Sequence, residues 1–428
     1  MPTSHIAKLI VLLLTIILGV LNAFVGAEPT TATHQETSAE RVEAKSASRT
    51  PDIQKDLRGV FFNPNIRHKC FAGYPWPIFD PYGPEYRAKI RAALREIADD
   101  ANLNFIDVVI AIPFTLARSA QAPKANQSLR DWANIAYLKN AAAFVDDCHD
   151  AGIFIQFDLV DNRWIPYFVD SKNHIGRPGG DCWPVADETP WDESATWYTQ
   201  VIEYIELHTK HPENIAMWGM MGNYQYGAAE PVLWDNDNIP EISEYTEKFV
   251  KKVWPVFKAA GKRPKASPIM LPIFSNNPYW MAKTPDDRLS AFKNLKKWLV
   301  DDLALRPDYW VMTTYPYCDP ATDGFYYLRR IVEILGKANA SRIISTDFKG
   351  PGHEQELACS IISTAGHSGR EILEWHFKKC VAYSFAGWWI FSYQDHEALE
   401  AQQTGIRGAN GQWKADLLTV IRQQGPAK

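Results

Sequence analysis

Strand-like runs alternate with helix-like runs eight times between about residue 57 and the C-terminus. The run 105–114 is apolar enough for a strand buried on both sides, and the segment 84–100 carries Ile90, Leu94 and Ile97 at helical spacing. A chain with this alternation closes most economically into a parallel barrel, with its chemistry at the C-terminal ends of the strands. The predicted fold class is therefore α/β, a single (β/α)8 TIM barrel with extended loops.

The same pattern gives approximate bounds for each element. We expect strands at 59–62, 105–114, 153–161, 215–221, 265–273, 309–317, 342–348 and 387–393. We expect helices at 84–100, 131–151, 194–210, 241–260, 286–304, 324–338 and 370–383. The second of these helices should end at Gly152, because glycine readily adopts the left-handed conformation that ends helices.

The first 56 residues are not part of the predicted barrel. Lys8 precedes an apolar run from residue 9 to about 21, and Val25-Gly26-Ala27 offers small residues where signal peptidase cleaves. We interpret 1–27 as a signal peptide, 28–56 as a disordered linker and 57–428 as the barrel domain. A membrane anchor is the alternative, but the run is shorter than the ~20 apolar residues of a spanning helix. The predicted location is secreted or periplasmic, without stable membrane insertion after cleavage.

Charge and cysteine content restrict the possible partners. The formal net charge is −5 and no Lys/Arg cluster interrupts the barrel pattern, so nucleic acid is not an expected partner. Six cysteines are an even number that an exported protein can pair, but their spacings select no pairing. The sequence has no CxxC or HExxH motif, and therefore predicts no metal and no cofactor. It leaves the oligomeric state open.

Carboxylates near the strand ends are the first candidates for chemistry. The candidates are Asp158, Asp161, Asp319, Asp347 and Asp395. Any one of them can instead cap a helix or form a loop ion pair. Asp347 differs because it sits inside an apolar strand, where burying a carboxylate is costly unless it is used or compensated. Asp347 is therefore the expected principal carboxylate.

Aromatic residues are the second signal. The chain has sixteen tryptophans, and many fall at strand ends or in the loops that follow. Trp218 and Trp388 can simply pack the barrel. Flat aromatic faces flanked by Asn, Asp and Tyr nevertheless suit sugar rings, because the C–H faces stack while the hydroxyl groups hydrogen-bond. We therefore expect a carbohydrate as the partner.

These strand-end motifs resemble those of the retaining glycoside hydrolases in the (β/α)8 clan that includes family 5 cellulases and mannanases. That clan has an aromatic residue before Asn-Glu on strand four, His-x-Tyr on strand six, Thr-Glu-Phe-Gly on strand seven and Trp on strand eight. This chain has Trp218 with Gly222-Asn223, Tyr315-Pro316-Tyr317, Thr346-Asp347-Phe348 and Trp388-Trp389 in the corresponding places. The resemblance implies that the substrate is bound by Trp218, Asn223, Tyr224, Tyr315, Tyr317, Trp388 and Trp389.

The chain also departs from the clan pattern. Asn223 or Tyr224 stands where the clan has its acid/base Glu, and neither can hold and return a proton as a carboxyl does. The nucleophile position holds Asp347, one methylene shorter than Glu. The acid must then come from elsewhere, and the candidates are Asp158, inward on the alternation of strand three, and Glu230, in the loop after strand four.

Two function classes follow from this comparison. The first is a secreted or periplasmic glycoside hydrolase that acts on an oligosaccharide or polysaccharide, with Asp347 as principal catalytic carboxylate and a non-standard acid/base. The second is a catalytically inactive barrel that binds carbohydrate, and a structural protein with no sugar site is a third possibility. In the first, Asn223, Tyr317, Asp347 and Trp389 face one cleft, with Tyr317 hydrogen-bonded to Asp347 and Trp389 under the sugar.

Overall fold

The computed structural model describes the greater part of the predicted barrel and little of the N-terminal segment. The described residues are 56–62, 78–79, 82–117, 126–160, 191–220, 251, 255, 271–273, 293, 296–304, 307–314, 326–349, 369–395 and 405–424. All of them lie in one compact unit formed by residues 50–428. The predicted signal peptide, 1–27, and residues 28–55 of the predicted linker lie outside the described residues. No helix in the described part of the chain is long and apolar enough to cross a membrane.

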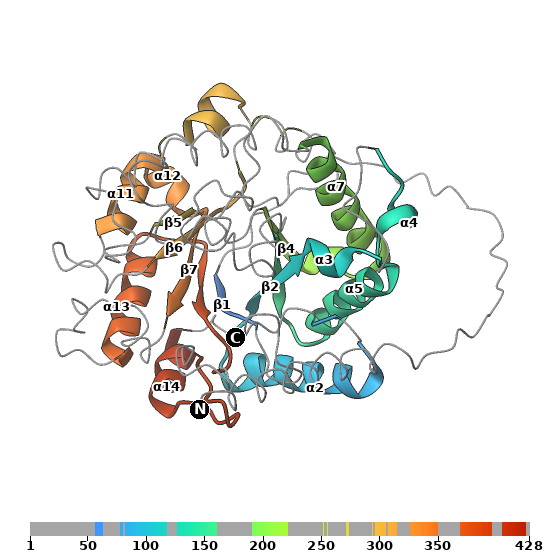
Figure 1. The fold of residues 1–428 in the computed structure, drawn as a ribbon. Coiled ribbons are helices and arrows are strands. Elements are labelled where there is room, and N and C mark those ends of the chain that lie inside the picture. The colour runs from blue at the N-terminus through green and yellow to red at the C-terminus, as the bar shows by residue number, and fades with distance from the viewer. Residues whose placement is uncertain are drawn as a thin grey trace, which may run out of the picture. The chain divides into compact units, whose positions relative to one another are not determined.

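Eight parallel strands form one sheet that is nearly closed into a barrel (Figure 1). The hydrogen-bonded order is β4-β3-β2-β1-β8-β7-β6-β5, so that β1 joins the first and last parts of the chain. The strands are β1 (Leu57–Phe61), β2 (Phe105–Ala111), β3 (Phe154–Val160), β4 (Ile215–Met220), β5 (Leu271–Ile273), β6 (Trp310–Thr314), β7 (Ile343–Lys349) and β8 (Gly387–Phe391). The predicted (β/α)8 fold class is confirmed.

Helices surround the sheet, with α2, α5 and α7 beside β1 to β4 and α11 to α13 beside β6 to β8 (Figure 1). Their bounds are α2 (Pro84–Arg95), α3 (Ile112–Thr115), α4 (Leu129–Trp132), α5 (Ile135–Asp150), α7 (Trp191–His208), α11 (Tyr326–Leu335), α12 (Lys337–Ala340), α13 (Gly369–Ala382) and α14 (Ala415–Gln424). Single helical turns, η2 (Glu96–Asp100), η3 (Pro212–Asn214) and η5 (Lys297–Asp302), complete the described helical structure. The predicted helix 241–260 lies almost wholly outside the described residues.

Two boundaries differ from the sequence prediction for local chemical reasons. The predicted strand 105–114 ends at Ala111 and continues as α3, where Pro113 is tolerated because the first turn of a helix does not use its missing N–H. The predicted helix 131–151 is divided, since the Asn134 side chain accepts a hydrogen bond from the Tyr137 N–H and starts α5 anew. Gly152, with φ of +71°, follows the end of α5 as predicted.

The strands separate two hydrophobic clusters because successive side chains point to opposite faces of a sheet. One cluster fills the space between sheet and helices, and on β8 it includes Trp388. The other fills the barrel interior, and on the same strand it includes Trp389. Each side of the sheet is thus recognisable from the cluster to which its residues belong. This division determines which of the predicted site residues can share one site.

Candidate active site

Trp389 lies on the barrel-interior face of β8. Its ring packs beside Phe61, with 6.2 Å between the ring centroids, and only 1% of the residue is exposed. The indole N–H finds no hydrogen-bond acceptor among the described residues. A buried donor left without a partner costs about 1–3 kcal/mol, and a bound ligand or water is one source of the missing partner. Trp389 is therefore well placed to meet a polar ligand at this end of the barrel.

A register shift in β7 occurs at the candidate catalytic residue. Ser345 pairs with Trp388, and the pairing resumes with Phe348 opposite Ile390. Two residues of β7, Thr346 and Asp347, therefore share the position opposite Trp389. Bulges of this kind are frequent beside active sites, where the extra residue changes the direction of a side chain. The backbone of Asp347 is thus in the strand, at an irregular position next to an interior tryptophan.

Asp158 lies in a buried polar cluster on the facing wall of the barrel. It is fully buried on β3, and the Gln156 side chain donates a 2.8 Å hydrogen bond to its Oδ1 atom. Gly219 on β4 pairs with Asp158, and a Cβ atom at Gly219 would lie 2.0 Å from Asp158 Oδ1. The absence of a side chain at residue 219 therefore makes the room that the carboxylate occupies.

Asp107 is a further buried carboxylate, which the strand-end pattern did not identify as a candidate site residue. It is fully buried on β2, where it pairs with Gln156, so that it lies on the same face of the sheet as Asp158. Its signal was available: a carboxylate inside an apolar strand is as costly at residue 107 as at residue 347. The barrel interior thus holds two described carboxylates on neighbouring strands.

Trp218 and Trp388 lie on the outer face of the sheet. Trp218 stacks on Phe157, with 5.1 Å between centroids, and its N–H donates a 2.9 Å hydrogen bond to Glu206 on α7. Trp388 stacks on Phe377 of α13 at 4.3 Å. Both side chains pack helices onto the sheet. The structure does not bring them to the face that carries Asp158 and Trp389.

The other predicted site residues are Asn223, Tyr224, Glu230, Tyr315 and Tyr317, which lie outside the described residues, as do Asp161 and Asp319. Asp395 is described and has partners of its own: it accepts hydrogen bonds from the Gly405 N–H at 2.7 Å and from Lys414 Nζ at 3.0 Å. These bonds hold the segment after β8 in place. Asp395 therefore has a structural role.

A buried serine, histidine and cysteine lie behind β7, between the sheet and α13. Ser345 Oγ is 3.1 Å from His376 Nε2, and Cys380 Sγ is 3.5 Å from the same atom. Burial lowers the pKa of His376 to about 3 and raises the pKa of Cys380 to about 12. The imidazole is thus neutral and the thiol protonated near pH 7, which is the opposite of what a nucleophilic pair needs. The cluster supports β7 just before the bulge.

Cysteine pairing can be judged at two positions. Cys148 and Cys380 are buried free thiols, and the other four cysteines lie outside the described residues. The two described thiols are on α5 and α13, in different parts of the outer layer. The described part of the chain therefore contributes no disulfide to its own stability.

No protein-family model matches the chain, and no curated protein sequence matches it. Solved structures do match it. A hyperthermophilic β-glucosidase from Pyrococcus furiosus is 10% identical, with a TM-score of 0.51 over 88% of this chain and 96% of that one. A hyperthermophilic β-glucosidase mutant that forms a dodecamer in the crystal is 12% identical, with a TM-score of 0.52 over 87% and 99%.

A third match is a variant of a family 5 glycoside hydrolase from Bifidobacterium longum, solved with Manβ1-4GlcNAc. It is 12% identical, with a TM-score of 0.48 over 86% of this chain and 77% of that one. The two glucosidases establish the fold: this chain folds as a TIM barrel, as they do. The resemblance indicated by the strand-end motifs is thereby confirmed at the level of the fold.

Proposed function

We propose that this protein is a glycoside hydrolase that acts on an oligosaccharide or polysaccharide outside the cytoplasm, with Asp347 as its principal catalytic carboxylate. The observation that carries the proposal is the bulge in β7, which brings Asp347 to the position opposite the interior residue Trp389. Glycoside hydrolysis needs a pair of carboxyl groups that flank the scissile bond. An aromatic ring beside one of them can hold the sugar ring by stacking. Trp389 offers that surface together with an indole N–H available for a hydroxyl group.

Strand register supports Asp158 as the second carboxylate. The parallel pairings lead from the Asp347 position, opposite Trp389, through β8, β1 and β2 to Phe154 on β3. In an eight-stranded barrel with a shear of about 8, the residue at a given height along the barrel axis shifts by about one position from each strand to the next. Across half the barrel the shift is about four positions. Four residues beyond Phe154 is Asp158. The two carboxylates are therefore expected at similar height on opposite walls.

The separation across the barrel favours a mechanism through water. A strand spacing of about 4.8 Å and a tilt of about 36° put facing Cα atoms about 15 Å apart. If both side chains point straight into the barrel, each carboxyl carbon lies about 2.5 Å from its Cα atom, and the two groups are about 10 Å apart. Inverting enzymes have carboxyl groups ~6.5–9.5 Å apart, whereas retaining ones have them ~5–5.5 Å apart. We therefore expect inversion, with one aspartate activating water and the other protonating the leaving group.

Glu230 is the alternative acid, and it lies ten residues after the end of β4 in the chain. Variants that remove the carboxyl group of Asp158 or of Glu230 distinguish the two candidates. Loss of the acid should abolish activity on a substrate with a poor leaving group. Activated aryl glycosides need little protonation of the leaving group and should tolerate loss of the acid. The acid is the residue whose variant remains active on activated aryl glycosides and is inactive on substrates with poor leaving groups.

A carbohydrate-binding barrel without turnover is the second candidate function. The environment of Asp158 favours it, because the carboxylate is fully buried and already accepts a hydrogen bond from Gln156. A group held in this way stabilises the barrel without exchanging protons with a substrate. Under this alternative Trp389 still binds the sugar.

A screen of the mature protein against a broad panel of polysaccharides and oligosaccharides distinguishes the two functions. Release of reducing ends measures turnover, and isothermal titration with the same oligosaccharides measures binding. Release from at least one glycan supports the hydrolase. Binding without release supports the alternative, and neither binding nor release across the panel contradicts both. The mass of the protein exported by its native host tests the predicted cleavage after Ala27.

A further inference from the structure

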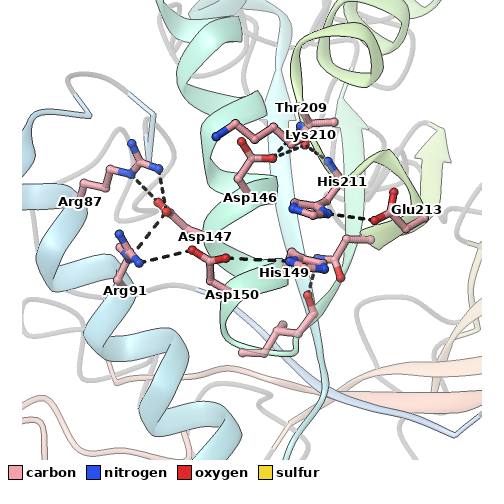
Figure 2. A network of polar contacts seen from close by, with 12 residues as sticks. Arg87, Arg91, Asp146, Asp147, His149, Asp150, Thr209, Lys210, His211 and Glu213 are labelled. Carbon is pink, nitrogen blue, oxygen red and sulfur yellow. Dashed lines mark hydrogen bonds and ion pairs between the residues drawn. The ribbon is translucent and has the colours of Figure 1, made fainter.

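Two histidines and a glutamate meet in a network of polar contacts (Figure 2). They precede β3 and β4, and so lie at the end of the barrel that is opposite the candidate active site. His149 is in the last turn of α5, shortly before β3 begins, and His211 and Glu213 are in the turn between α7 and β4. All three therefore precede their strands, whereas Asp158 and Asp347 lie further along theirs. Nothing in the proposed hydrolysis uses this group of residues.

The three side chains are close enough to share one ligand. The imidazole rings of His149 and His211 stack in parallel, with 3.4 Å between centroids and 3° between planes. His211 Nδ1 is 3.0 Å from Glu213 Oε1. One ligand atom from each of the three residues lies within 4.8 Å of the others. Their side chains are 42%, 31% and 66% exposed, in the order His149, His211 and Glu213, so an ion can reach them from solvent.

The backbone that carries these side chains is fixed by hydrogen bonds. Asp146 of α5 accepts bonds from the Thr209 hydroxyl at 2.7 Å and from the Lys210 N–H at 2.8 Å, as Figure 2 shows. The His211 N–H in turn donates to the Thr209 hydroxyl at 3.1 Å. The Asn214 side chain donates to the Ile153 carbonyl at 2.7 Å. The turn before β3 and the turn before β4 are therefore linked directly, which holds the three groups together before any ligand arrives.

We propose that His149, His211 and Glu213 bind a divalent transition-metal ion, with Zn²⁺ as the representative ion. Two imidazoles and a carboxylate are a ligand set that zinc takes, with water in the remaining position. Ligand atoms around a tetrahedral zinc are ~3.3 Å apart, so the ligand atoms must approach one another by up to about 1.5 Å and the stacked rings must tilt. Their exposure permits both movements. The bound ion connects the turns before β3 and β4 and stabilises the folded barrel.

Zinc binding to the tag-free, chelator-treated protein tests the proposal. Isothermal titration compares the wild type with His149→Ala, His211→Ala and Glu213→Gln, and thermal unfolding with and without Zn²⁺ provides a second measurement. His208→Ala is the matched control, because His208 is a nearby surface histidine that stacks on Tyr204 at 3.9 Å, outside the cluster. Circular dichroism confirms that each variant is folded.

The wild type and His208→Ala should each bind one equivalent of Zn²⁺. His149→Ala and His211→Ala should bind that equivalent at least ~10-fold more weakly. Zn²⁺ should raise the unfolding temperature of the first two proteins and not of His149→Ala or His211→Ala. Other histidines in the chain can bind zinc too, so the decisive quantity is the equivalent lost on substitution. Equal stoichiometry and affinity in the wild type and His149→Ala would overturn the proposal, as would a wild type that binds no zinc. Both readouts are independent of glycoside hydrolysis.

Discussion

Replacing Gly219 by alanine should disturb Asp158 directly. A Cβ atom at residue 219 would lie 2.0 Å from Asp158 Oδ1, whereas ordinary van der Waals contact begins at 3.4 Å. The carboxylate or the backbone of β4 must therefore move by about 1.4 Å. Movement of the carboxylate also breaks the hydrogen bond that it accepts from Gln156.

The size of the effect follows from these two losses. Overpacking in a rigid core costs about 1–3 kcal/mol. A hydrogen bond to a charged group contributes about 1.5–3 kcal/mol. Gly219→Ala should therefore lower the free energy of unfolding by about 2.5–6 kcal/mol, which corresponds to a fall of about 3–8 °C in Tm for a domain of this size. If Asp158 also takes part in the reaction, a displacement of this size lowers the rate by at least about 100-fold.

Thermal and urea unfolding of the wild type and four variants measure the effect: Gly219→Ala, Gly83→Ala, Asp158→Ala and the double variant. Gly83→Ala is the control, because Gly83 has an ordinary φ of −70° and a Cβ atom there would meet nothing within 4 Å. Asp158→Ala removes the clashing oxygen, so Gly219→Ala should cost less than about 1 kcal/mol in that background. A Gly219→Ala protein as stable as Gly83→Ala would refute the reasoning, and so would an equal loss with and without Asp158.

Three further predictions concern neighbouring parts of the barrel. Trp388→Ala should lower the free energy of unfolding by about 3–5 kcal/mol and leave sugar binding unchanged. Trp389→Ala should weaken oligosaccharide binding at least about tenfold in titration calorimetry. The reverse pattern would contradict the assignment of the two tryptophans to opposite faces of the sheet. Burial holds the pKa of His376 at about 3, against about 6.5 in the unfolded chain. Between about pH 3 and about pH 6.5 only the unfolded chain binds a proton at His376, so the free energy of unfolding falls by about 1.4 kcal/mol for each unit that the pH is lowered. Urea unfolding of His376→Gln should show a smaller dependence on pH, and an unchanged dependence would contradict this role of His376. Arg87→Met should cost about 2–3 kcal/mol in chemical unfolding because it removes two 2.7 Å bonds to the buried carboxylate of Asp147 (Figure 2), and a loss under 0.5 kcal/mol would be inconsistent with that role.

The fold was predictable because strand and helix leave different periodicities in the sequence. Alternation of the two specified a parallel barrel, and Gly152 marked the end of α5. The division of the predicted helix 131–151 was less visible, because Asn134 acts through a single side-chain bond that apolar spacing does not register. Local capping chemistry thus set boundaries that periodicity alone could not.

The site was less predictable because strands of a parallel barrel are buried on both faces. Trp388 and Trp389 must point to opposite sides, but both sides are apolar, so the sequence does not tell which tryptophan faces the interior. The bulge at Asp347 interrupts the alternation of side chains along β7, so alternation does not predict the direction of this side chain. The cluster of His149 and His211 has no motif at all, since the two residues meet only when the turns before β3 and β4 fold together.

The most direct test of the proposed function compares wild type and Asp347→Asn on the glycan that the screen identifies. The substitution removes the charge and hardly changes the shape, so the account predicts a loss of several kcal/mol in the barrier, at least about 1,000-fold in kcat. Binding of the same oligosaccharide, measured by titration calorimetry, should stay within about threefold of the wild type. An Asp347→Asn protein that releases reducing ends at the wild-type rate would contradict the central claim.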